Sequence, residues 1–332
     1  MEPNHMRYLA RRATARRVTA IAFAAATLVA TAAQAQGDRP VRFILPVATA
    51  SGVDTITRAA SPALAKALGS PVVVENQPGA GGIVGTTTLV KAVPDGTTLS
   101  IVSNNHVIYP SVYKSVPFDP IADITPIVQL SRGPYVVAVH PSVPAKTLQE
   151  LVSLARKEPD KLAYASSGNG SHVHVATEYL LYTAKIKITH VPYKGTGPAL
   201  NDTIGGSVQM ILGSVATALQ HVKSGRLRAL AVTTPKRIAA APDVPTVAES
   251  GYPSYEVTNW HGLVGPKGLP KDIVGRLNKE ANEALKSKDA EKVLAGDGLE
   301  PAGGSPEEFA VIIKNEVARW SQVVKQAGVK VD

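Results

Sequence analysis

The sequence contains no cysteine and few aromatic residues. Its 332 residues include 0 Cys, 2 Trp and 4 Phe. The absence of cysteine excludes disulfides, thiolate metal ligands and a cysteine nucleophile. Stability must therefore come from an ordinary hydrophobic core, and a chain of this length usually divides its core between two lobes.

Long apolar runs are also scarce, and the one at the N-terminus is too short to span a bilayer. It covers about residues 18–32, below the roughly 20 residues that a membrane helix needs. Five arginines precede it, and Ala33-Gln34-Ala35 follows with the small-x-small pattern of a cleavage site. We expect a signal peptide over residues 1–35, cleaved near Ala35, and an exported mature protein. The paired arginines leave both the Sec and the twin-arginine routes open.

A dense basic block is missing as well. The signal peptide removes five of the 35 basic and one of the 26 acidic residues, which leaves a mature net charge of +5. The remaining charges are scattered, without the interleaved aromatic residues typical of nucleic-acid binding. We expect no nucleic-acid partner.

The best-known catalytic motifs are absent. The chain has no G-x-S-x-G elbow, no G-x-x-x-x-G-K-[ST] loop and no H-E-x-x-H, and the glycines of residues 79–85 do not fit G-x-G-x-x-G. These absences argue against hydrolase, nucleotide and zinc-protease functions. We expect no cofactor and no metal.

What the sequence does contain is an alternation of short apolar strands with helical stretches, which predicts an α/β fold with mainly parallel sheets. The helix expected between Asp54 and Leu68 contains Pro62, which predicts a kink or break near residues 60–62 and a stop at Gly69. Residues 270–329 are expected to be rich in helix. Strands are expected at 41–47, 70–76, 97–103, 135–140, 161–167, 188–193, 208–214, 227–233 and 261–266.

The segment YASSGNGSHVHVATEYL, residues 164–180, supports several interpretations. A metal site at His172 and His174 fails on a regular helix, because residues two apart do not face each other. A Ser/His catalytic pair remains open. So does a merely structural helix start, with one histidine buried and the other exposed. The fourth interpretation is an anion site, because the first N–H groups of a helix lack partners and carry partial positive charge.

Four segments fit the anion interpretation in the same way. Residues 48–54, 103–106, 166–171 and 193–199 are small, polar or glycine-rich, and each follows an expected strand. Open α/β sheets hold ligands at the carboxyl ends of their strands. The four segments are therefore predicted to line one cleft.

The mature chain resembles the substrate-binding receptors of the tripartite tricarboxylate transporter system, the Bordetella uptake gene family. The resemblance rests on PVVVENQPGAGGIVG (71–85), PDGTTL (94–99), YASSGNGS (164–171), HVPYKGTGPAL (190–200), GRLRALAVTT (225–234), PDVPTVAESG (242–251) and EPAGGSPEEF (300–309). It implies a two-lobed periplasmic-binding-protein (flytrap) fold that binds a small organic carboxylate without catalysis. It also implies delivery of that ligand to two integral membrane subunits, and we expect the receptor to be a monomer.

The resemblance further places two crossings between the lobes, near residues 131–138 and 255–262. Lobe 1 would combine residues 36–134 with 259–332, and lobe 2 would span 135–258. The ligand-binding residues that it implies are Val47, Thr49, Ala50, Ser51, Asp54, Asn104, Asn105, His106, Ser166, Ser167, Gly168, Asn169, Gly170, Ser171, His172, Tyr193, Gly195, Gly213 and Thr217.

Departures from the family pattern bear on the ligand. Gly213 stands where similar proteins often have an aspartate that could pair with an amino group, which disfavours an amino acid. Room at Gly213 and an imidazole donor at His172 would suit a bulkier, aromatic carboxylate. The expected ligand is thus a dicarboxylate or an aromatic carboxylate. A secreted Ser/His hydrolase and a sensor subunit that presents ligand to a membrane kinase are the alternatives.

Overall fold

The computed structural model describes residues 39–49, 51–296 and 298–329; the expected signal peptide, its cleavage site and Ala50 lie outside them. Two sheets share one long strand, β4 (Ile124–Val139). The first sheet has the order β2-β1-β3-β9-β4, with β10 also paired to β4. Its other strands are β1 (Val41–Leu45), β2 (Val72–Asn76), β3 (Thr98–Ser103), β9 (Thr258–Pro266) and β10 (Glu300–Gly303).

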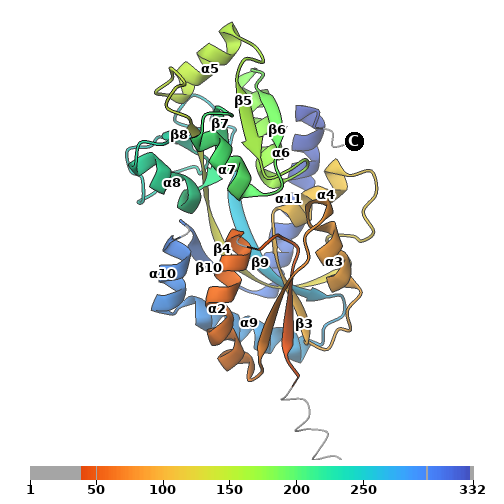
Figure 1. Cartoon of the computed structure of the whole chain (residues 1–332). Coiled ribbons are helices and arrows are strands. Elements are labelled where there is room, and N and C mark those ends of the chain that lie inside the picture. The colour runs from red at the N-terminus through yellow and green to blue at the C-terminus, as the bar shows by residue number, and fades with distance from the viewer. Residues whose placement is uncertain (1–38, 50, 297, 330–332) are drawn as a thin grey trace, which may run out of the picture.

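The second sheet continues from the other half of β4. Its order is β4-β7-β5-β6, and β8 also pairs with β4. Figure 1 shows these strands in the upper part of the molecule and the first sheet in the lower part, joined by β4 and β9. The strands added here are β5 (Ala163–Ser166), β6 (Thr189–Pro192), β7 (Met210–Ser214) and β8 (Arg228–Val232).

Helices cover both sheets on both faces. Residues of α2 and α9 pack on one side of the first sheet, and α7 and α8 pack on one side of the second. The helices are α2 (Gly52–Leu68), α3 (Ile83–Val90), α4 (Asn105–Val112), α5 (Leu148–Lys157), α6 (His172–Ala184), α7 (Thr196–Ile204), α8 (Val215–Lys223), α9 (Lys271–Leu285), α10 (Lys288–Gly296) and α11 (Pro306–Ala327), with a 3₁₀ turn η1 at Ala80–Gly82. None of the helices within the described part of the chain is long and apolar enough to cross a membrane.

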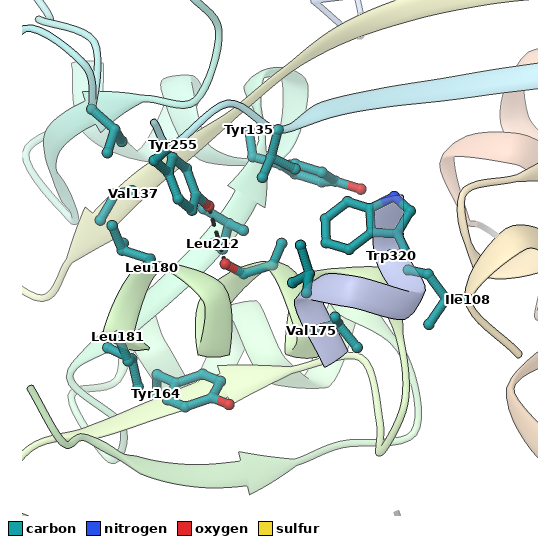
Figure 2. Packing of buried hydrophobic residues seen from close by; sticks show 14 of the residues in the cluster. Ile108, Tyr135, Val137, Tyr164, Val175, Leu180, Leu181, Leu212, Tyr255 and Trp320 are labelled. Atoms are coloured by element: carbon teal, nitrogen blue, oxygen red, sulfur yellow. Dashed lines mark hydrogen bonds between the residues drawn. The ribbon is translucent and has the colours of Figure 1, made fainter. Parts of the chain in front are cut away.

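One hydrophobic cluster runs along both sheets. It joins Ile108 of α4, Tyr135 of β4, Val175 of α6 and Trp320 of α11. Figure 2 shows Trp320 beside Ile108 and Tyr135, and Tyr255 donating a hydrogen bond to the Ala176 carbonyl. The C-terminal helix α11 therefore packs against elements of both sheets.

The nine strands expected from the sequence are all present, but the sheets are mixed rather than mainly parallel. β1 pairs in parallel with β2 and β3, and β5 with β6 and β7. The pairs that involve β4 and β9 are antiparallel. The first half of β4 and the whole of β10 were not anticipated, because neither segment is a compact apolar run.

The break expected in the second element was wrong, since α2 continues through Pro62. Pro62 is exposed. The hydroxyls of Thr57 and Ser61 donate to the carbonyls four residues earlier, at 2.7 and 2.8 Å. The predicted stop is confirmed: Gly69 ends the helix in a left-handed conformation, with φ of 64°.

Candidate functional site

The strand directions bring the predicted loops toward one region. β3 is antiparallel to β9, and β9 is antiparallel to β4, so β1 and β3 run in the same direction as β4. β7 is antiparallel to β4, so β5, β6 and β7 run in the opposite direction. Since β4 leads from the first sheet to the second, the carboxyl ends of both strand sets point toward the junction between the sheets.

Helix starts follow these strand ends. Ser51, Ser171 and Ser214 each cap the following helix, accepting a hydrogen bond from the backbone N–H three residues later. α7 begins after Gly195, whose φ is 113°, and α4 begins after Asn104. Each helix directs the positive end of its dipole toward its preceding loop. The junction is therefore an environment that favours anions.

Residues 166–171 form a compact turn between β5 and α6. Gly168 and Gly170 have positive φ angles of 132° and 69°, a region that side chains rarely adopt. Ser171 N–H donates to the Gly168 carbonyl at 3.2 Å. Within the described residues no hydrogen bond engages Ser167 Oγ or the Asn169 side chain, which is exposed. These two side chains are the polar groups of the turn that remain available to a ligand.

Two stacked histidines hold the ends of this turn. His190 of β6 contacts Ser166 Oγ through Nε2 at 2.6 Å, and His174 of α6 accepts from Gly170 N–H through Nδ1 at 3.0 Å. Their rings are nearly parallel, with centroids 3.9 Å apart. Burial lowers the pKa of His174 to about 3 and that of His190 to about 4, so both rings are neutral at neutral pH.

His172 lies on the opposite side of the helix start. Its Nδ1 is 3.0 Å from Tyr135 Oη, and its ring meets Trp320 edge-on at 4.8 Å between centroids. Burial lowers its pKa to about 3, and Nε2 is buried with no hydrogen-bond partner among the described residues. Both histidines of the segment are thus buried, at 4% and 6% exposure, which contradicts the expected buried and exposed pair.

Asn104 and Asn105 have different surroundings. Asn104 is fully buried: its Oδ1 accepts from Trp260 N–H at 2.8 Å, and its Nδ2 donates to the Thr258 carbonyl and to Glu316. Asn105 accepts from His172 N–H at 2.8 Å, which links α4 to the start of α6. Asn104 therefore supports the junction between β3 and β9, and Asn105 fixes the turn at 166–171.

His106 is also buried. Its Nε2 lies 2.8 Å from the Pro120 carbonyl and its ring stacks on Phe118. Burial lowers its pKa to about 4. The imidazole is thus held by residues 118–120 and not by the neighbouring strand ends.

The first predicted loop leads into a local polar group. Asp54 is buried, and its Oδ1 accepts from Arg58 Nε and from Asn76 Nδ2, both at 2.9 Å. Asn76 also donates to the Val47 carbonyl at 3.3 Å. Thr49 is exposed and Val47 is half-buried. The Asp54 carboxylate is therefore already hydrogen-bonded to Arg58 and Asn76.

The remaining predicted residues sit on the second sheet. Tyr193 N–H donates to the Ser166 carbonyl at 3.0 Å, so the loops at 166–171 and 192–195 are adjacent; the Tyr193 hydroxyl donates to Asp202. Thr217 Oγ1 contacts the capping hydroxyl of Ser214 at 2.9 Å. A Cβ at Gly213 would lie 3.3 Å from Ala218 Cβ, so this glycine does not leave the open room that was expected.

The geometry does not favour Ser/His catalysis or metal binding. Ser166 and His190 are in contact, but Ser166 is only 1% exposed and its Oγ also accepts from Gly168 N–H, so a substrate carbonyl cannot reach it. Among the described residues, no cluster of three His, Cys, Asp or Glu side chains could hold a metal ion. His172 and His174 face different partners, as their spacing predicts.

An open cavity of about 840 Å³ lies elsewhere in the second half of the molecule. Residues from the ends of α5 and α6, together with Ser254 and Gln326, line it. None of the predicted ligand residues is among them. The loops at the strand ends, which carry the helix starts and glycine turns, remain the better candidate site.

Sequence reasoning missed three residues that shape this region: His190, Glu316 and Asn76. His190 lies within a motif that was recognised, and parallel register places it opposite Tyr164, two residues before Ser166. That register could have revealed its contact with the turn. Glu316 comes from a distant helix, and no local pattern in the sequence indicates its position beside Asn104.

Comparisons with known proteins agree on one family. The family model described as "Tripartite tricarboxylate transporter family receptor" matches residues 56–329. BugT of Bordetella pertussis is 34% identical over 88% of this chain and 90% of its own. An R. palustris protein solved with adipate is 33% identical, with a TM-score of 0.83 over 88% of this chain and 98% of its own. MatC of Rhodopseudomonas palustris with bound malate is 31% identical, with a TM-score of 0.80 over 86% and 99%.

These similarities confirm the fold class expected from the sequence. The solved neighbours include a periplasmic transporter and the periplasmic binding protein BugD, with TM-scores of 0.83 and 0.81. The two mixed sheets joined by β4 and β9 are the two-lobed arrangement of such proteins. The matched proteins are solute-binding receptors and not enzymes.

Proposed function

Because this chain belongs to the tripartite tricarboxylate transporter receptor family, we propose that it binds a small dicarboxylate between its lobes. It receives the ligand in the periplasm, after cleavage of the signal peptide near Ala35, and delivers it to two integral membrane subunits. The convergence of the strand ends of both sheets on one junction is the observation that carries this proposal. Helix starts on both sides offer N–H donors to the two ends of a dianion.

The lobe boundaries follow the pairing of β4. Pro134 pairs with Thr258 of β9, and Tyr135 pairs with Ser214 of β7. This switch supports lobe 1 as residues 36–134 plus 259–332 and lobe 2 as residues 135–258. A ligand held by loops of both lobes favours the closed state through its greater affinity for it.

The charges around the loops favour a ligand without an amino group. Asp54 is the only acid among the predicted residues, and it already accepts from Arg58 and Asn76. Room at Gly213 and a free imidazole at His172 suggested an aromatic ligand. The structure supports neither, because Ala218 lies beside Gly213 and His172 packs against Trp320. We therefore place an aliphatic dicarboxylate first and an aromatic carboxylate second. Relatives solved with adipate and malate support this order.

A thermal-shift and calorimetry screen tests the proposal. The probes are adipate, malate, benzoate, phthalate and glutamate. A ligand at a hundred times its Kd adds about 2.7 kcal/mol to the stability of the folded form. Adipate or malate should raise Tm and be recovered unchanged. Binding of glutamate alone, or conversion of a probe, would contradict the proposal.

The Ser167→Ala variant tests whether residues 166–171 form part of the ligand site. Loss of one hydrogen bond to a carboxylate costs about 1.5–3 kcal/mol, or about 10- to 150-fold in Kd. Ser207→Ala is the matched control, since Ser207 is exposed and lies outside the predicted loops. Unchanged affinity in Ser167→Ala would move the site away from residues 166–171. A pull-down with the membrane subunits distinguishes a transport receptor from a sensor subunit.

A further inference from the structure

The hydrogen bonds within the turn at residues 166–171 are few and all involve Gly168. Ser171 N–H donates to the Gly168 carbonyl, and Ser166 Oγ contacts the N–H and the carbonyl of Gly168, each at 3.2 Å. Two of the six residues are glycines with positive φ. A turn of this composition loses much conformational entropy when it is ordered. Side chains from outside the turn must supply the order that a ligand site requires.

His174 and His190 meet this need at the two ends of the turn. His190 Nε2 lies 2.6 Å from Ser166 Oγ at the first end, and Gly170 N–H donates to His174 Nδ1 near the second. The rings stack with an interplanar angle of 8°. Because the two rings are in contact, a shift at one end of the turn would move the ring that holds the other end.

We infer that His174 and His190 form a clamp that positions the turn at 166–171 for ligand binding, without touching the ligand. The inference rests on the proposed function for its effect on affinity. The hydrogen bond by which His174 holds Gly170 does not depend on a ligand. The two rings are positioning residues, and Ser167 and Asn169 are the groups that they present.

The surroundings keep the clamp neutral. Tyr164 of β5 stacks on His190, with centroids 4.9 Å apart, and its hydroxyl donates to Glu178 of α6 at 2.5 Å. Burial raises the pKa of Glu178, and it lowers the pKa of His174 to about 3 and that of His190 to about 4, so both rings are neutral at neutral pH. A neutral His174 leaves Nδ1 free to accept from Gly170 N–H, a role that the imidazolium cannot perform.

Hydrogen exchange of the Gly170 amide in the ligand-free protein tests the clamp directly. His174→Ala removes the acceptor and should accelerate exchange of this amide about tenfold or more. His174→Asn places an oxygen near the former Nδ1 and should restore most of the protection. His261→Asn is the control, because His261 is equally buried but contacts Ser131 of the first sheet. It should leave the Gly170 amide unchanged.

The same variants are then titrated with adipate and malate. We expect His174→Ala to weaken binding about 3- to 10-fold and His174→Asn to weaken it less, in line with the loss of one neutral hydrogen bond. If the parent binds neither probe but exchange follows the expected pattern, the dicarboxylate assignment fails and the clamp stands. Equal protection of Gly170 in His174→Ala and the parent would overturn the clamp. So would equal loss in His174→Asn and His174→Ala.

If His174→Ala does not fold, two variants of His190 test the clamp at the other end of the turn. His190→Ala removes the partner of Ser166, and His190→Gln retains a polar group near Nε2. The clamp predicts faster exchange over residues 166–171 in the first variant and recovery in the second. Indistinguishable exchange in these two variants would contradict it.

Discussion

Glu316 of α11 contacts β9 and Asn104 as well as its own helix, and its Oε2 lies 3.5 Å from Trp260 Nε1 of β9. Its Oε2 accepts from Trp320 Nε1 at 2.9 Å and from Asn104 Nδ2 at 3.3 Å, while Oε1 accepts from Arg319 at 3.3 Å. Asn104 in turn holds the backbone of β9 at Trp260. Glu316→Ala leaves the Trp320 and Asn104 donors without this acceptor, and each buried unsatisfied group costs about 1–3 kcal/mol. We expect a loss of about 2–4 kcal/mol in the free energy of urea unfolding.

Asn315→Ala provides the neighbouring control. Asn315 is exposed on the same helix, and alanine is the better helix former, so stability should stay within about 0.5 kcal/mol of the parent. If both variants unfold at the same urea concentration as the parent, Glu316 is a surface acid with no role at the junction.

Single residues also show what the sequence could and could not predict. The capped start after Ser171 followed from local chemistry, because a serine cap is satisfied by the N–H three residues later. The partners of His172 did not, since Tyr135 and Trp320 are 37 and 148 residues away in the chain. Local sequence patterns predict caps and turns, whereas the ring contacts of His172 depend on tertiary packing.

The contact between β9 and α11 depends on a glycine in the strand. A Cβ at Gly262 would overlap the ring of Phe309, which also packs edge-on against Trp260. Gly262→Ala should therefore destabilise the protein by about 1–3 kcal/mol through overpacking. Adding Phe309→Leu should cost less in this background than in the parent, because the two changes are coupled. Strictly additive losses would show that the strand and helix adjust independently.

Gly275→Ala is the matched substitution within α9. A Cβ there would meet nothing within 4 Å, and Gly275 does not have a positive φ. Replacing a helical glycine by alanine stabilises by about 0.5–1 kcal/mol. The same chemical change should thus raise Tm at residue 275 and lower it at residue 262.

At the scale of elements, apolar runs predicted eight of the shorter strands and the second half of β4, but neither β10 nor the first half of β4. That segment contains Ser131, Arg132 and Gly133 and pairs with β9 through two register shifts. Its strand character comes from its neighbours in the sheet and not from its own periodicity. Pro62 misled in the opposite sense, because α2 continues through it although a proline cannot donate the backbone hydrogen bond of a helix.

For the whole molecule, the length of the chain indicated two lobes, the order of strands and helices indicated an α/β fold, and the family resemblance supplied where the lobes join. Strand directions around β4 then explain why loops far apart in sequence approach one junction. Composition alone could not supply this, because it does not indicate which strands are antiparallel. The same tertiary packing buries several histidines in neutral form, which has a consequence for acid stability.

His106, His172 and His261 are each at most 6% exposed, and burial lowers their pKa values to about 4, 3 and 4. Unfolded histidines titrate near 6.5, so below that pH the unfolded chain binds more protons than the folded protein. Stability is therefore fully present above about pH 6.5 and falls as the pH drops toward the folded pKa values. At pH 5 the loss is about 2 kcal/mol for each fully buried histidine.

Urea unfolding at pH 7.5, 6 and 5 measures this loss. Carboxylates whose pKa is lowered, such as Glu75, act mainly below pH 4.5 and do not interfere. Burial raises the pKa of Glu178, and a raised carboxyl pKa acts in the opposite direction, because it adds stability as the pH falls. His261→Asn removes one titrating group while keeping an oxygen that can meet Ser131, so its stability should fall less steeply with pH than that of the parent. Equal stability of the parent at pH 7.5 and 5 would mean that these imidazoles are protonated in the folded protein, and hence reached by water.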